Sequence, residues 1–391
     1  MHSDKPPSAS QRSPERERVL RNVVVAFCML TLFCACEVGL RVYARVSNYI
    51  PKVNLYDAPH YFLGRALIPN AHFKSTAGEI NVNSHGFRGE EFATSKPKGN
   101  YRIFAMGGST TFGYYPATSS DQTAYPGVLA TMLQANRPNP SVDKYEVINA
   151  GVPGYSMRTL TQSLLARILF FEPDMVVITE VTNDLARYGN LAGLDHPLEN
   201  QFVPMGIVTG FLDNFLGWSY AVQELRFVLE TRVWGGLIAR FTNVSDPNSS
   251  GSKNWVRDAR YEDVFRRDVR NLVRLAKLNG VTPVLATQAI SFREDTDFSN
   301  LTADEITMQF DKPAIFYATV PGNERYQMFR RYNGIIREVA EAEGAIYADV
   351  DAAVPKTSEY HWDYCHLTDK GSAIQAEVIF QAISKRARSG S

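Results

Sequence analysis

Tyr101-Arg-Ile-Phe-Ala-Met-Gly-Gly-Ser-Thr-Thr-Phe-Gly113 sets the architecture of this chain, because an apolar run stops there at two glycines and a hydroxyl residue. Residues 101–106 predict a buried strand, and Gly107 and Gly108 predict a tight turn with backbone angles that other residues avoid. Such a turn exposes Ser109 at the start of a helix, which makes it a candidate nucleophile. A plain helix N-cap is the alternative. A phosphate-binding loop is disfavoured, because its Gly-Lys-Ser/Thr ending is missing.

The rest of the chain alternates apolar strands with helices. Strand-like runs recur at 145–149, 175–179, 282–287 and 345–349, and helical patterns lie around 125–133 and at 159–171, 257–278 and 372–384. Five strands separated by helices predict an α/β fold with a three-layer, doubly wound, mostly parallel five-stranded sheet. Because such sheets bind ligands outside the carboxyl ends of their strands, we expect the functional site at the edge where Ser109 lies.

Two more strand ends carry groups that can stabilise a developing oxyanion. Asn149-Ala-Gly151 ends the second strand at a glycine whose N–H can approach a ligand closely, and Thr182-Asn-Asp184 follows the third strand with the side-chain amide of Asn183. Each feature has a simpler explanation as turn chemistry. Because both follow strands next to that of Ser109 in the chain, we expect Gly151 and Asn183 at the same sheet edge.

A nucleophilic serine needs a general base, and the chain has only seven histidines. Two lie in Tyr360-His-Trp-Asp-Tyr-Cys-His-Leu-Thr-Asp-Lys-Gly371, directly before the last helix. Asp363 precedes His366 by three residues, so one short loop can present both to the serine. His361 is the alternative base, and we expect it to be a surface or structural residue. With Cys365 this cluster also resembles a zinc ligand set, but its crowding leaves no second ligand pair, which disfavours a metal.

The N-terminal region predicts a membrane anchor. Residues 1–20 are rich in Ser, Pro, Arg and Glu and predict a disordered cytoplasmic tail. Residues 21–42 are apolar enough to span a bilayer, and the excess of Arg before them predicts a cytoplasmic N-terminus with the bulk of the chain outside. A cleaved signal peptide and a lipid-modified cysteine are the alternatives, but the residues around Cys34 fit both poorly. Glu37 is tolerable near the outer interface.

Two segments fall outside the regular alternation. Residues 47–98 show no clear period and predict an N-terminal extension packed on the core domain, 99–387, with a short strand at 80–83. Within the extension, Arg88 stands among turn formers, where we expect a structural role. Residues 190–257 form an insertion rich in bulky apolar side chains. We expect a lid or a wall of a substrate groove; a membrane-contacting helix and a self-contained apolar core are the alternatives.

Composition excludes some classes of function. The 391 residues carry 41 basic and 41 acidic side chains, so the net charge gives no basis for binding nucleic acid. The four cysteines form no disulfide framework, since three of them lie together in the apolar N-terminal run. No motif indicates a cofactor.

These residues together resemble the SGNH, or GDSL-type, hydrolase superfamily, and in particular its bacterial membrane-anchored branch. The four blocks of that family match Gly107-Gly-Ser-Thr110, Asn149-Ala-Gly151, Thr182-Asn-Asp184 and Asp363-Tyr-Cys-His366, in this order, over about residues 100–387. The resemblance implies a flavodoxin-like SGNH hydrolase fold. Two positions depart from the family pattern: Gly108 stands where the naming motif has Asp, and Val181 stands where Gly often precedes Thr-Asn-Asp.

The resemblance also implies roles. Ser109 is the expected nucleophile, His366 the general base and acid, and Asp363 the residue that orients His366. The N–H groups of Ser109 and Gly151 and the amide of Asn183 are the expected oxyanion hole.

The function implied by the resemblance is that of a serine esterase. Its expected substrates are short-acyl esters, with O-acetyl groups on a cell-surface glycan favoured. The catalytic domain is expected on the periplasmic or extracytoplasmic side of a bacterial inner (cell) membrane. An O-acyltransferase acting on such a glycan shares the first half-reaction, and a non-catalytic glycan-binding or assembly protein on the same fold is a further alternative.

Overall fold

The computed structural model describes residues 14–47, 57–60, 62–75, 78–113, 118, 120–185, 219, 221, 259–297 and 322–389. These residues belong to two compact units, one made of Met1–Val53 and Phe215–Ile238, the other of Asn54–Asn214 and Ala239–Ser391. The insertion expected at 190–257 lies outside the described residues, apart from Ser219 and Ala221. Its expected role as a lid or groove wall therefore stays a prediction.

The first unit contains helix α1, Pro14–Ser47. Proline suits the first turn of a helix, because the N–H that it lacks has no partner there. Glu15–Tyr43 is long and apolar enough to cross a membrane by length and composition, a property that a signal sequence shares. Residues 14–20, which the sequence predicts to be part of a disordered tail, belong to this helix, because α1 already begins at Pro14.

Glu37, the carboxylate within the apolar run of α1, is almost fully buried inside this unit. It accepts hydrogen bonds from Ser219 Oγ at 2.8 Å and from the Ala221 N–H at 3.0 Å, and it pairs with Arg41 one turn further along the helix. A buried carboxylate is costly unless it is paired and hydrogen-bonded. These partners therefore explain how Glu37 is accommodated in an apolar helix.

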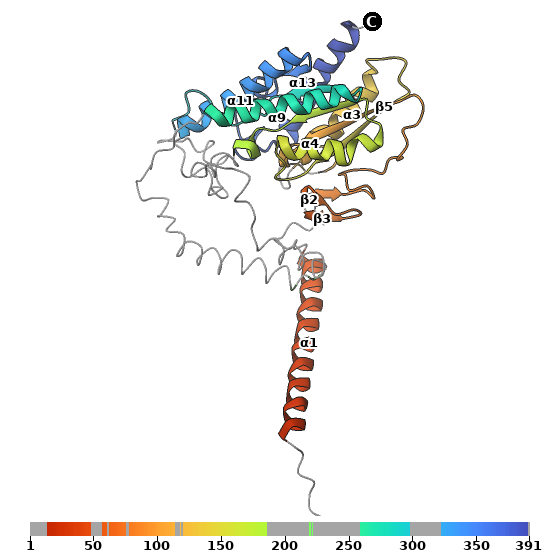
Figure 1. Ribbon diagram of the computed structural model, residues 1–391, viewed down its shortest axis with the longest axis vertical. Helices are drawn as coiled ribbons and strands as arrows, with labels where there is room; N and C mark the ends of the chain where they lie inside the picture. Colours follow the sequence, from red (N-terminus) through yellow and green to blue (C-terminus); the bar gives the residue numbers. More distant parts are fainter. Residues whose placement is uncertain are drawn as a thin grey trace, which may run out of the picture. The chain divides into compact units, whose positions relative to one another are not determined.

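The second unit is built on a parallel sheet with the strand order β6-β5-β7-β8-β9 (Figure 1). All neighbouring strands of this sheet are parallel, which confirms the predicted five-stranded, doubly wound α/β fold. The strands are β5 (Asn100–Gly107), β6 (Lys144–Gly151), β7 (Met175–Thr179), β8 (Thr282–Ala286) and β9 (Ile346–Ala348).

Helices cover both faces of the sheet and produce three layers (Figure 1). They are α2 (Ser109–Phe112), α3 (Tyr125–Asn136), α4 (Met157–Ala166), α9 (Ala259–Leu278), α11 (Gly322–Glu343), α12 (Val350–Ala353) and α13 (Asp369–Ser389). Successive strand residues face opposite sides. Phe104 and Met106 of β5 accordingly pack in a core cluster with α4, α9 and α11, whereas Ile103 and Ala105 pack in a second cluster with α3 and α13.

Two helices differ from the sequence prediction. The helix predicted at 159–171 is interrupted, because Arg167 has the non-helical angles φ −136° and ψ −55°; α4 ends before it and the 3-10 helix η1 (Ile168–Phe171) follows. Helix α11 was not predicted, although the signal is present in the sequence. Its buried side chains recur with helical spacing at Phe329, Tyr332, Ile335, Ile336, Val339 and Ala340.

The N-terminal extension packs on the sheet domain. It contains two antiparallel hairpins, β1 (Asp57–His60) with β2 (Gly64–Leu67), and β3 (His72–Ser75) with β4 (Gly78–Asn81). The short strand expected at 80–83 overlaps β4, and the other three strands were not predicted. Ile80 and Phe87 are buried in the same core cluster as Phe104 of β5, so the extension shares its apolar core with the sheet.

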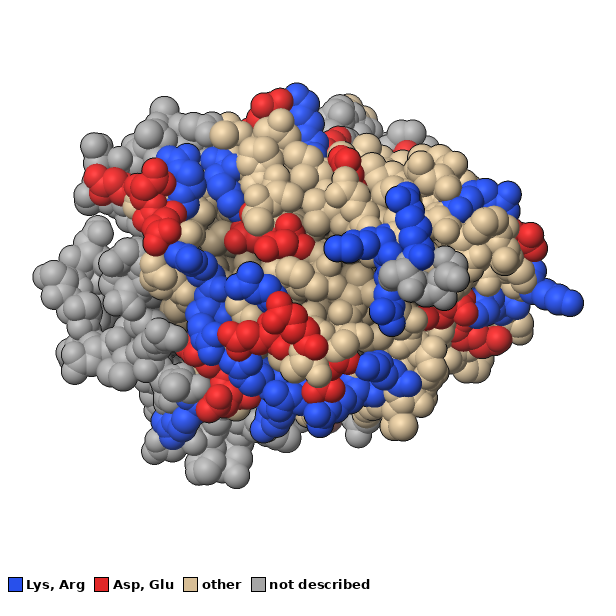
Figure 2. Space-filling view, turned by 90° about the horizontal axis from the view of Figure 1, so that it is seen from above, with Lys and Arg blue, Asp and Glu red and all other residues tan. Residues whose placement is uncertain are grey.

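Charges of both signs are interspersed on the surface. Figure 2 shows Lys and Arg alternating with Asp and Glu across the face seen from above. Ion pairs such as that of Arg274 with Glu343 link α9 to α11. This mixture agrees with the formal net charge of +0.

Candidate active site

The turn after β5 presents Ser109 at the first position of α2. The unusual φ values expected for Gly107 and Gly108 are not found: neither has a positive φ, and that of Gly108 is −85°. The reason for glycine is space. A Cβ on Gly107 would lie 2.1 Å from Thr111 Oγ1 and 2.4 Å from the carbonyl oxygen of Thr179. Glycine is therefore required so that helix and strand can approach the turn.

Ser109, His366 and Asp363 form a continuous chain of hydrogen bonds. His366 Nε2 lies 2.7 Å from Ser109 Oγ, and His366 Nδ1 lies 2.5 Å from Asp363 Oδ2. A carboxylate can only accept a hydrogen bond, so the partners assign the proton to Nδ1 and leave Nε2 as an acceptor for the serine hydroxyl. In this arrangement the imidazole can take the proton of Ser109.

The second carboxylate oxygen of Asp363 holds the loop that carries His366. Oδ1 accepts hydrogen bonds from the N–H groups of Cys365 at 2.8 Å and His366 at 2.7 Å. Burial by itself raises the pKa of Asp363, but the charge and hydrogen bonds of His366 outweigh burial and hold this pKa below its ordinary value. Asp363 is therefore an anion that both orients the imidazole and stabilises the loop.

Gly151 lies beside the turn that carries Ser109, as predicted. It is the register partner of Gly107, and a Cβ on Gly151 would lie 2.2 Å from the backbone nitrogen of Phe112. The Gly151 N–H donates to Asn149 Oδ1 at 3.0 Å. A ligand oxygen at this edge must therefore share the Gly151 N–H with Asn149 Oδ1 or take the place of that oxygen.

Asn183 also lies beside the turn, and its amide already has two acceptors. Nδ2 donates to the carbonyl oxygen of Tyr155 at 2.9 Å and, over a longer 3.2 Å, to Glu180 Oε2. A Cβ on Gly108 would lie only 2.4 Å from Asn183 Nδ2, which places the amide next to the residue before Ser109. The structure therefore brings Asn183 to the expected place with its donors engaged.

Glu180 is a residue of this site to which the sequence analysis assigned no role. It directly follows β7, is only 1% exposed, and accepts a hydrogen bond from the Asn183 N–H at 2.7 Å. Burial and the neighbouring charge of Asp184 raise the pKa of Glu180 to about 8. The sequence feature that could have pointed to Glu180 is its position as a carboxyl group directly after an apolar strand.

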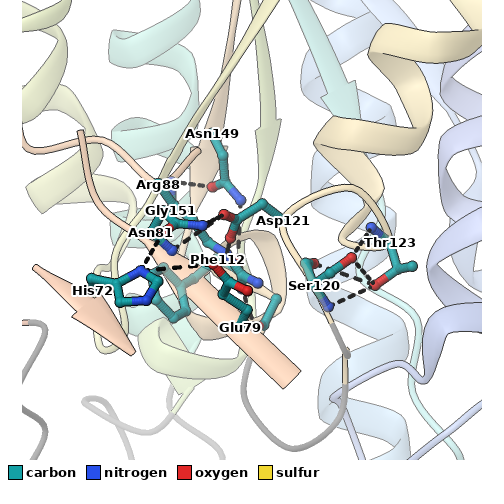
Figure 3. Close-up of polar contacts among 11 residues, drawn as sticks. His72, Glu79, Asn81, Arg88, Phe112, Ser120, Asp121, Thr123, Asn149 and Gly151 are labelled. Carbon is teal, nitrogen blue, oxygen red and sulfur yellow. Dashed lines mark hydrogen bonds and ion pairs between the residues drawn. The ribbon is translucent and has the colours of Figure 1, made fainter. Parts of the chain in front are cut away.

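Arg88 of the extension contacts the end of α2 (Figure 3). Its side chain is fully buried, Nη1 donates to the carbonyl oxygens of Phe112 and Gly113, and Nε pairs with Asp121 at 2.6 Å. Asn149 Nδ2 donates to the same Phe112 carbonyl at 3.1 Å. The extension thus holds the carbonyl end of the helix that begins with the candidate nucleophile, which agrees with the structural role expected for Arg88.

His361 and Cys365 are buried neighbours of the Ser109 and His366 pair. Neither ring nitrogen of His361 has a hydrogen-bond partner among the described residues, and burial lowers its pKa to about 3, so His361 is a neutral side chain in the interior. Burial raises the pKa of the Cys365 thiol, which makes it a poor nucleophile. The atoms of Cys365, His366 and Asp363 that could coordinate a metal lie within 4.8 Å of one another. His366 and Asp363, however, are already hydrogen-bonded to each other through Nδ1 and Oδ2.

The sequence model of the GDSL-like lipase/acylhydrolase family matches residues 105–374, more than half of the chain. The chain belongs to this family. As a GDSL-like acylhydrolase it is a serine ester hydrolase. The matched range includes Ser109, Gly151, Asn183 and the loop of His366, whereas α1 and the extension precede it.

Solved structures similar to this GDSL-like hydrolase are distant in sequence. LAE5, an α/β hydrolase from the metagenome of Lake Arreo, is 14% identical, with 72% of this chain and 94% of that chain covered and a TM-score of 0.41. Axe2, an acetylxylan esterase from Geobacillus stearothermophilus, is 15% identical, with 72% and 94% covered and a TM-score of 0.40. A GDSL-like lipase from Bacteroides thetaiotaomicron is 15% identical, with 75% and 93% covered and a TM-score of 0.40. The search of curated proteins returned no match.

Proposed function

We propose that this GDSL-like hydrolase cleaves short-acyl esters through an acyl-enzyme on Ser109, and that O-acetyl groups on a cell-surface glycan are its substrates. The observation that carries the proposal is the distance of 2.7 Å between Ser109 Oγ and His366 Nε2. The side chains of His366 and Asp363 are 14% and 18% exposed, so both keep some contact with solvent. The preference for short acyl groups rests on the resemblance to membrane-anchored SGNH enzymes.

The proposed reaction has two half-reactions. Ser109 Oγ attacks the carbonyl carbon of the ester while His366 Nε2 takes the hydroxyl proton, and His366 then gives this proton to the departing alcohol. Water next attacks the acyl-enzyme, His366 takes a proton from the water, and the acid is released as Ser109 is re-protonated. Asp363 keeps the imidazole in the required tautomer and stabilises its positive charge.

The negative charge that develops on the carbonyl oxygen needs hydrogen-bond donors. The N–H groups of Ser109 and Gly151 and the Asn183 amide are the proposed donors. Gly151 and Asn183 have partners of their own in the resting structure. The proposal therefore requires the oxyanion to share these donors, and the 3.2 Å contact of Asn183 with Glu180 is the longest of their present hydrogen bonds.

A fluorophosphonate probe tests the nucleophile. The full-length protein should be labelled, the Ser109→Ala variant should not, and His366→Ala should lose labelling while it keeps its thermal melting transition. Labelling of a different residue, or unchanged labelling in Ser109→Ala, contradicts the proposal.

Product analysis tests the reaction type. We expect the enzyme to release free acetate from an O-acetylated polysaccharide and from an activated acetyl ester. Acetyl groups found on an added sugar acceptor, in place of free acetate, assign the enzyme to acyl transfer and contradict hydrolysis as its main activity.

We further propose that α1 anchors the enzyme to a bacterial cell membrane, with a cytoplasmic N-terminus and an extracytoplasmic hydrolase domain. The length and composition of Glu15–Tyr43 support a membrane-spanning helix. In a bacterial host, the full-length chain should stay in the membrane fraction after carbonate extraction, and external protease should digest its hydrolase domain in spheroplasts. Recovery of a shortened chain in the soluble fraction indicates a cleaved signal sequence.

A further inference from the structure

Glu180 places an acidic side chain in the interior directly beside the nucleophile turn. Glu180 is 1% exposed. Its Oε1 accepts a hydrogen bond from the Asn183 N–H at 2.7 Å, and its Oε2 lies 3.2 Å from Asn183 Nδ2. These contacts tie the carboxyl to both the backbone and the side chain of Asn183. The reaction proposed above gives Glu180 no chemical step, so its burial needs another reason.

Gly108 supplies that reason, because it leaves room for the Glu180 carboxyl. The φ of Gly108 is −85°, so glycine is not needed there for a positive φ, although its ψ of −147° lies outside the usual helical and extended regions. A Cβ on Gly108 would, however, lie 2.4 Å from Glu180 Oε2 and 2.4 Å from Asn183 Nδ2. Position 108 is where the naming motif of the family has Asp. In this chain a carboxyl group from the next strand occupies the space beside position 108.

We propose that Glu180 is a positioning residue of this site: its carboxyl group fills the space left by Gly108 and fixes the Asn183 amide next to Ser109. The inference rests on the proposed function, because it assumes that Asn183 and Ser109 act on the same carbonyl. Glu180 does not touch the reacting atoms. It sets where the Asn183 amide points and how closely the turn before Ser109 approaches it.

The protonated form of Glu180 suits this position. Burial raises the pKa of Glu180 to about 8, and Asp184 and the Cys365 thiol are the titratable groups that face it from the turn after β7 and the loop before α13. At pH 7 the carboxyl is therefore mostly protonated and repels an oxyanion held by Asn183 less than a carboxylate would. Above pH 8 an anion forms next to that oxyanion and opposes it.

Two substitutions of Glu180 test the positioning role. Glu180→Gln preserves the shape and neutrality of the protonated acid, and we expect fluorophosphonate labelling of Ser109 at pH 7 close to that of the unmodified protein. Glu180→Ala removes the support of Asn183, and we expect a labelling rate about 100-fold lower, the usual cost of a misplaced catalytic group. Glu377→Ala, which removes an exposed carboxyl group of α13, is the control and should label normally.

The pH profile separates positioning from a merely structural role. Hydrolysis by the unmodified enzyme should decline above about pH 8 as Glu180 ionises, whereas Glu180→Gln should keep its activity there. An alkaline decline that persists unchanged in Glu180→Gln, or normal labelling of Glu180→Ala, overturns the inference.

A substitution at Gly108 tests, without an activity measurement, whether the Glu180 carboxyl occupies the space beside this residue. Gly108→Ala should lower the melting temperature strongly in the unmodified chain and less in the Glu180→Ala background, because the clash with Glu180 is then gone while that with Asn183 remains. If the losses in melting temperature from Gly108→Ala and Glu180→Ala are additive in the double variant, the inference that the Glu180 carboxyl fills the space beside Gly108 is wrong. If Ser109 is not labelled in the unmodified protein, the proposed function fails, and this melting cycle still decides where the Glu180 carboxyl lies.

Discussion

The carbonyl oxygen of Phe112 accepts a hydrogen bond from Arg88 Nη1 at 2.6 Å, across a sequence separation of 24 residues. Phe112 is the last residue of α2, and Ser109 is the first. A helix of four residues has little stability of its own. The position of Ser109 therefore depends on a side chain from the extension, outside the matched family domain.

Replacing Arg88 should destabilise the fold and slow the enzyme together. Arg88→Met leaves Asp121 and the carbonyl ends of α2 without their buried partner, and we expect a loss of about 3–5 kcal/mol in the free energy of unfolding. Urea denaturation measures this loss. Arg274→Met removes the exposed guanidinium that pairs with Glu343 and is the control, with a urea midpoint expected to stay close to that of the unmodified protein. Equal losses in the two variants contradict the role given to Arg88.

Asp363→Asn should separate orientation from folding. Asn keeps an oxygen that can accept the Cys365 and His366 N–H groups, but its amide donor faces His366 Nδ1 and favours the wrong tautomer. We expect kcat to fall on the order of 10⁴-fold, with a melting temperature near that of the unmodified protein. Ester hydrolysis and thermal melting measure the two effects. Retention of full activity contradicts the assigned tautomer.

His361 should make the fold sensitive to acid. Burial holds the pKa of His361 near 3 in the folded protein, whereas the pKa in the unfolded chain is about 6.5. Between these two pH values the unfolded chain therefore binds a proton at His361 and the folded chain does not. The stability of the unmodified protein should therefore decrease as pH falls from 6.5 towards 3. His361→Leu removes this ionisation, so its stability relative to the unmodified protein should rise over that interval in urea titrations. A constant difference between the two proteins contradicts the prediction.

Glu180 should have the opposite pH dependence. Its pKa is about 8 in the folded protein and ordinary in the unfolded chain, so the folded state retains a proton that the unfolded state has lost. The unfolding free energy of the unmodified protein should thus decrease from pH 4.5 to 8. Glu180→Gln cannot ionise, and its advantage over the unmodified protein should grow across this interval. Equal stability at pH 5 and pH 8 in both proteins contradicts a buried neutral carboxyl.

Local patterns in the sequence predicted the sheet and the three polar residues that now lie in contact. Apolar runs ending at glycine or at Thr-Asn-Asp mark the carboxyl ends of strands, and parallel strands bring these ends to one edge. Ser109, Asp363 and His366 could be selected in this way, because each lies in a short motif next to a predicted element. The length of the uninterrupted apolar run in α1 likewise predicted a helix long enough to cross a membrane.

The tertiary structure decided what depends on space and on distant partners. Gly108 was expected to have an unusual φ, which it does not have, whereas Glu180 and Asn183 occupy the volume that a side chain at position 108 would need. Arg88 stood among turn formers, yet its partners lie on α2 and at Asp121. The periodicity of a strand or helix depends only on residues that are close together in the sequence, because each side chain faces a fixed direction relative to its neighbours. The burial of a carboxyl or a guanidinium depends on segments far away in the chain, and only their packing reveals which groups meet.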